Sequence, residues 1–197
     1  MLCLRGAESD LVLPGPRRRD NARLSLGDVM ALSMYEISVP VILRGLGQLE
    51  HILAKGIAHA RENNADPDRY VQARLAPDML TLAGQVQRAS DTAKATIARI
   101  TGVEAPSFPD EESTMEQLIS RSGKTRAFVD GVDRTLFDTA AGREVEMKLG
   151  GNVVKFAGQQ YLLQFGLPNF FFHVTTAYDV LRNQGVPIGK RDYLGKF

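Results

Sequence analysis

Apolar residues recur every three or four positions along most of this chain, which is the spacing of one face of an α-helix. Four long segments carry the pattern, and we expect helices over about residues 33–64, 77–101, 113–133 and 159–184. The apolar positions of the first segment are Tyr35, Val39, Ile42, Leu46, Leu49, Leu53 and Ile57. Amphipathic helices of this length bury their apolar faces against one another, so the pattern predicts an all-α, up-down four-helix bundle.

Residues with known preferences for helix ends predict where the middle helices begin and stop. Pro77 and Asp78 are typical of the first turn of a helix, and Gly102 is a natural stop for the same segment. Ser113 and Glu116 have the spacing of a capping box, which would open the third helix. We expect the two-proline linker between these helices, residues 103–112, to carry the chain across one end of the bundle.

The helical period breaks once, before the last helix. Residues 144–149 alternate strictly between polar and apolar, Gly150, Gly151 and Asn152 supply turn chemistry, and residues 153–156 can pair back. This pattern predicts a small β-hairpin. In the helix that follows, Pro168 predicts a kink or a break, because proline has no backbone N–H to donate.

The beginning of the chain lacks periodicity. Residues 1–32 mix glycine, proline and aspartate with a run of three arginines, so we expect a flexible N-terminal extension. The remaining residues, 33–197, are enough for one domain with a substantial core.

Composition removes several classes of function. With 24 basic and 23 acidic side chains, no strong positive field is available to attract nucleic acid or an anionic membrane. No run approaches the roughly 20 apolar residues of a membrane span. The single cysteine, Cys3, allows no internal disulfide and no thiolate metal cluster. We therefore expect a cytoplasmic protein that binds neither nucleic acid nor membranes.

Four parts of the sequence together carry a resemblance: the runs 74–79, 167–178 and 188–192, and the hairpin. They resemble a bacterial domain-of-unknown-function family that is grouped with the DinB/YfiT-like four-helix bundles. The resemblance covers about residues 33–195. It implies the same bundle with a hairpin before the last helix. Catalytic DinB-like proteins bind a divalent metal through three histidines, one on the second helix and two at i and i+4 on the last.

This chain departs from that metal pattern. His173 could be one ligand, but its i+4 neighbour is Ala177 and its i−4 neighbour is Asn169. The second helix offers Gln85 and Asp91 where a histidine is expected. We therefore predict no metal site and no cofactor, and His173 with Asp91 are only weak candidates for holding a divalent ion.

The same polar residues have a structural and a functional interpretation. A histidine among phenylalanines is commonly a hydrogen-bonded core residue, and Asp91 with Lys94 is commonly a surface ion pair. The functional interpretation requires Gln85, Asp91 and His173 to converge on a pocket between helices. The candidates for such a ligand pocket are Asp78, Gln85, Asp91, Asn169, His173 and Tyr178.

Two hypotheses of function remain. The first is a non-catalytic bundle that binds a small molecule or forms a homodimer, suggested by the missing histidine triad and the aromatic-rich last helix. The second is a diverged metal-dependent transferase or hydrolase of the DinB-like kind, acting with a thiol cofactor, suggested by the resemblance and by His173. We favour the first, because a fold alone does not establish a chemistry.

Overall fold

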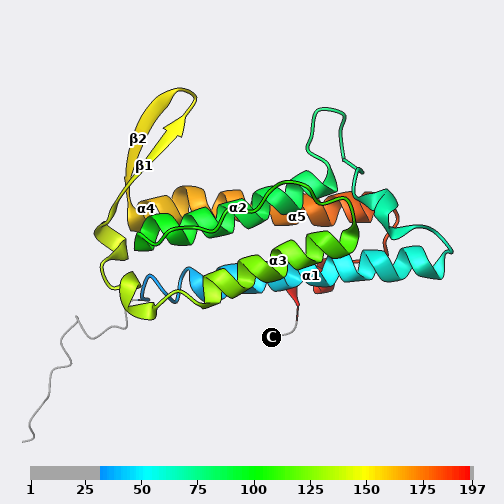
Figure 1. The fold of residues 1–197 in the computed structure, drawn as a ribbon, viewed down its shortest axis with the longest axis horizontal. Helices are drawn as coiled ribbons and strands as arrows, with labels where there is room; N and C mark the ends of the chain where they lie inside the picture. Colours follow the sequence, from blue (N-terminus) through cyan, green and yellow to red (C-terminus); the bar gives the residue numbers. More distant parts are fainter. Residues whose placement is uncertain (1–31, 196–197) are drawn as a thin grey trace, which may run out of the picture. The chain divides into compact units, whose positions relative to one another are not determined.

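A computed structural model describes residues 32–195, most of which are helical (Figure 1). The long helices are α1 (Val39–Glu62), α2 (Leu82–Thr101), α3 (Met115–Asp130) and α5 (Leu167–Asn183). The shorter elements are η2 (Pro67–Tyr70), η3 (Arg134–Phe137), η4 (Ala140–Gly142), α4 (Gly158–Tyr161), the π-helix η5 (Leu162–Gly166) and α6 (Lys190–Leu194). Strands β1 (Glu144–Leu149) and β2 (Asn152–Ala157) pair antiparallel. The predicted helical bundle with a hairpin before its last helix is confirmed, whereas the predicted N-terminal extension lies, apart from Leu32, outside the described residues.

The four long helices share one apolar core. α1 packs against α3 and α5, and α2 packs against the same two helices, so α1 and α2 occupy opposite corners of the bundle. On α1, the residues at three- and four-residue steps are fully buried, as their spacing predicts: Leu46, Leu49 and Leu53. None of the helices between residues 32 and 195 is both long and apolar enough to cross a membrane.

The helices run up, down, down and up, because the linker between α2 and α3 returns along the bundle (Figure 1). The carbonyl of Pro106 lies next to Lys94, and Glu112 lies next to Gln87, so the linker runs antiparallel to α2. The expectation that this linker crosses one end of the bundle is therefore wrong. An extended linker of this length can span the roughly 30 Å of a 20-residue helix.

A buried arginine holds the linker in place. Arg121 of α3 is only 2% exposed. Its guanidinium donates to the carbonyl oxygen of Pro109 at 2.9 Å and to the carboxylate of Glu112 at 3.0 Å, both in the linker. It also donates to Asp91 of α2 at 2.9 Å. Burial acts to raise the pKa of Glu112, but hydrogen bonds from Gln87 and Arg121 outweigh it, so the pKa of this carboxyl lies below its ordinary value.

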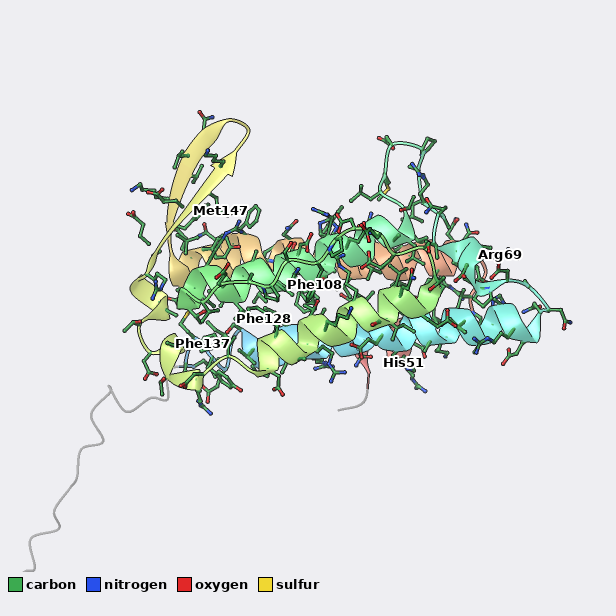
Figure 2. All side chains as sticks on the ribbon, in the orientation of Figure 1. His51, Arg69, Phe108, Phe128, Phe137 and Met147 are labelled. Carbon is green, nitrogen blue, oxygen red and sulfur yellow. The ribbon has the colours of Figure 1, made fainter. Side chains whose placement is uncertain are left out.

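Lys94 makes a second buried cationic contact with the linker. Its ammonium donates to the carbonyl oxygen of Pro106 at 3.0 Å and lies 3.9 Å from the ring centroid of Phe108, which is labelled in Figure 2. Its ion pair with Asp91 is present at 3.2 Å, as predicted. The expectation of a surface pair is wrong, however, because the linker covers Lys94 and leaves it only 4% exposed.

Two helices begin later than predicted. α2 begins at Leu82, where the side chain of Thr81 accepts the backbone N–H of Gly84. Asp78 therefore lies in an exposed turn before α2 and not in its first turn. The capping box of α3 is formed by Thr114 and Gln117, one residue after the predicted pair.

We expect Arg121→Met to lower the free energy of unfolding by about 3–5 kcal/mol, because the partly buried carboxylates of Glu112 and Asp91 would lose the cation between them. Arg61→Met is the matched control. It removes an exposed pair between α1 and α3, Arg61 with Glu116 at 2.9 Å, and should cost less than about 1 kcal/mol. Urea unfolding followed by circular dichroism measures both. Equal losses in the two variants would contradict the anchoring role of Arg121.

Candidate functional site

One side of a groove of about 230 Å³ is formed by a straight stripe of α2 residues. The stripe begins at Arg88, ends at Arg99, and includes Asp91, Thr92 and Ala95. Arg88 and Arg99 are 11 residues apart (99 − 88), which at about 100° per residue is three turns plus only about 20°. The side chains between them therefore point to the same side of α2.

The opposite side of the groove comes from the last helical segment: Tyr161, Phe165, Asn169 and His173. Successive members of this set are four residues apart. In an uninterrupted α-helix, the side chains of Tyr161 and His173 would therefore point in directions about 120° apart around the helix axis. The π-helix η5 lies between them, and its i→i+5 hydrogen bonds place about one extra residue in the turn. This extra residue removes about 100° of the difference in direction. All four side chains can therefore face α2.

Pro168 accounts for the position of the π-helix. A proline cannot donate to the carbonyl four residues earlier, and its ring would collide with that carbonyl, so the hydrogen-bond ladder must change there. The predicted kink or break takes the form of a π-turn just before the proline, and the helical backbone continues into α5. Gly166 allows this turn to approach α2 closely, since a Cβ at this position would lie 2.8 Å from Cγ2 of Thr96.

Gln85 of α2 fixes the protonation pattern of His173. The amide nitrogen of Gln85 donates to the carbonyl oxygen of Leu80 at 3.5 Å, so its amide oxygen faces the imidazole. That oxygen lies 2.8 Å from Nδ1 of His173 and can only accept, so Nδ1 carries the proton. Nε2 is then the lone-pair nitrogen, and no hydrogen bond reaches it from the part of the chain that the structure describes.

The surroundings of His173 favour its neutral form. Burial lowers the pKa of His173 below its ordinary value of 6.5, and the nearby Arg88 guanidinium lowers this pKa further. The neutral imidazole therefore stabilises the fold above pH 6.5, and this contribution is lost as the pH falls through the lower folded-state pKa.

Two further hydrogen bonds join α2 to the last helical segment along the groove, in addition to the contact between Gln85 and His173. The side-chain amide of Asn169 donates to the hydroxyl of Thr92 at 3.0 Å, which is a contact between α5 and α2. Arg99 donates to the hydroxyl of Tyr161 at 2.9 Å.

The structure brings together four of the six predicted pocket residues. Asp91, Asn169 and His173 line the groove, and Gln85 holds His173. Asp78 does not reach it. Tyr178 lies on another face of α5, where its ring meets Tyr193 edge-on at 5.8 Å.

Sequence reasoning missed the remaining groove residues for two reasons. Arg88 and Arg99 share the stripe of Asp91, and that spacing was a usable signal. Tyr161 and Phe165 gave no such signal, because α-helical spacing places them away from His173.

The two weak metal candidates, Asp91 and His173, line the same groove, but Asp91 already has other partners. Asp91 pairs with three cations, at 3.2 Å from Arg88, 3.2 Å from Lys94 and 2.9 Å from Arg121. Its oxygens are therefore already engaged. Within residues 32–195, no three side chains of the His, Cys, Asp and Glu types gather closely enough to hold an ion together.

The fold and the groove define a helical bundle of the DinB-like class. The model of a domain of unknown function, DUF1993, matches residues 34–194, and this chain belongs to that family. A crystal structure of a DinB family member protein from Shewanella denitrificans is similar, with 34% sequence identity and a TM-score of 0.75. The similarity covers 83% of this chain and 92% of that one. No curated protein sequence matches the chain.

We expect Arg88→Gln to raise the pKa of His173 towards 6.5 without reaching it, because a repelling cation is removed while burial remains. Titration of the imidazole carbon protons by NMR measures this change. Arg182→Gln, an exposed substitution in the last turn of α5, is the control and should leave the pKa unchanged. An unchanged pKa in Arg88→Gln would contradict the electrostatic coupling.

We also expect Gly166→Ala to destabilise the protein by about 1–3 kcal/mol, because the new methyl group collides with Thr96. Thr96→Ala should recover most of that loss in the double variant, since it vacates the same space. It also removes a buried hydroxyl that has no hydrogen-bond partner. Thermal unfolding of the four proteins in this cycle measures the coupling, and strictly additive losses would show that the two residues do not collide.

Proposed function

We propose that this protein binds a small polar molecule in the groove between α2 and α5 and does not catalyse a reaction on it. The observation that carries the proposal is the contact between Gln85 and His173, which leaves Nε2 as the acceptor of a residue that lines the groove. A few fixed polar groups in a small concave site are typical of ligand recognition. The ligand would present a hydrogen-bond donor to His173.

The charges in the groove support binding more than acid–base catalysis. General acid–base catalysis uses a group whose pKa lies near the working pH and which can reach the reacting proton. Asp91 is held in ion pairs with Arg88, Lys94 and Arg121, so its carboxylate oxygens already have partners. His173 is left as the candidate base of the groove, since Asp91 is held by three cations and the hydroxyl of Tyr161 accepts from Arg99.

A diverged metal-dependent transferase or hydrolase acting with a thiol cofactor is the second candidate. One observation favours it: metal-binding histidines usually donate their other ring N–H to an oxygen, as Nδ1 of His173 does to Gln85. The similar crystal structure of a DinB family member supports this candidate by resemblance only. Homodimerisation likewise stays a prediction from the sequence.

A ligand screen of the protein purified without a histidine tag tests the first proposal. Small polar molecules that bind by saturation-transfer NMR should lose about threefold to tenfold in affinity in His173→Gln, because a hydrogen-bond acceptor is displaced. His51→Gln on α1 is the matched control and should bind as the wild type does, since His51 is exposed and lies away from the α2–α5 pair (Figure 2).

Elemental analysis of the same samples separates the two candidates. About one metal ion per chain that is lost in His173→Gln would favour the metal-dependent candidate. Ligands that bind His173→Gln and His51→Gln with equal affinity would contradict a binding site at His173.

A further inference from the structure

We propose that the ligand of the α2–α5 groove is an aromatic carboxylate, whose ring packs on Phe165 and whose carboxylate binds Arg99. This inference rests on the proposed function and names its ligand class. It depends on the end of the groove away from His173, where the stacked rings of Tyr161 and Phe165 meet the guanidinium of Arg99.

The aromatic pair is already arranged as a stack. The rings of Tyr161 and Phe165 are 5.9 Å apart between centroids and 23° from parallel. Tyr161 is fully buried, whereas Phe165 is partly exposed and lines the groove, so Phe165 offers a ring face on which another flat ring can continue the stack. The π-helix brings both rings to this side of the helix.

The two arginines of the groove differ in their partners. Arg88 pairs with Asp91 and with Asp110, so its charge is balanced. Within residues 32–195, no carboxylate pairs with Arg99, whose contacts are the hydroxyl and the ring of Tyr161. An arginine presents several N–H donors in a planar fork that suits the two oxygens of a carboxylate. The anionic group of a ligand is therefore expected at Arg99.

Tyr161 orients this cation. Its buried hydroxyl oxygen accepts one N–H of Arg99 at 2.9 Å. The guanidinium keeps its other N–H donors for an anion. A groove of about 230 Å³ suits a compact molecule of one or two rings.

The inference is tested by calorimetry with 2-naphthoate, its neutral analogue 2-naphthamide, and the non-aromatic cyclohexanecarboxylate. We expect 2-naphthoate to bind at least tenfold more tightly than either analogue. Arg99→Gln should weaken 2-naphthoate about tenfold, and Phe165→Leu should weaken it while leaving the binding of cyclohexanecarboxylate unchanged. Arg182→Gln is the charge-matched control and should bind 2-naphthoate as the wild type does. Circular dichroism melting of each variant checks that the fold is kept.

The outcomes separate this inference from the proposed function. Equal affinity for 2-naphthoate and its analogues, or equal affinity in Arg99→Gln and the wild type, would overturn the assignment of an aromatic carboxylate. Ligands of another class that depend on His173 would overturn this inference and leave the proposed function standing. Failure of every ligand to respond to either His173→Gln or Arg99→Gln would overturn both.

Discussion

The buried guanidinium of Arg121 is the contact on which the order of the bundle depends. α2 and α3 run in the same direction, so the chain between them must return along their length. That return exposes backbone carbonyls and carboxylates to the interior, which is costly unless cations and hydrogen-bond donors meet them. Arg121 supplies these donors to Pro109, Glu112 and Asp91 at once. With the linker held over α2 and α3, the other side of α2 is left to pair with α5, and the groove forms there.

The same network reaches the groove through Asp91. One of its carboxylate oxygens lies beside Arg121 and Lys94, and the other accepts from Arg88 at 3.2 Å. Arg88 is the cation that helps to keep His173 neutral. The ion pairs that hold the linker thus also position Arg88 beside His173 at one end of the groove. Removing the charge of Asp91 would therefore change both the free energy of unfolding and the pKa of His173.

The sequence predicted what depends on local spacing and missed what depends on distant contacts. Helical periodicity, the stop at Gly102 and the hairpin follow from neighbouring residues, and the structure has them. Gln85, Asp91 and His173 were singled out because they stand on the two helices where the resemblance places metal-binding histidines. The path of the linker was not predictable, because Arg121 reads as an ordinary exposed arginine until its partners on α2 and in the linker are placed. The predicted start of α2 failed because a proline and an acid also suit a turn.

The groove also differs from the three-histidine site that the resemblance implies for catalytic DinB-like proteins, and the difference lies in Gln85. A histidine at that place on the second helix would add a second ligand for an ion, which a lone imidazole cannot replace. A glutamine instead gives its amide oxygen to Nδ1 of His173 and fixes which ring nitrogen accepts. Its amide nitrogen is held in turn by Leu80, so the arrangement persists without an ion. The π-helix then brings two aromatic rings to the same side of the helix as Asn169 and this imidazole. One oriented acceptor and a row of flat or polar side chains suit an organic molecule better than a cation.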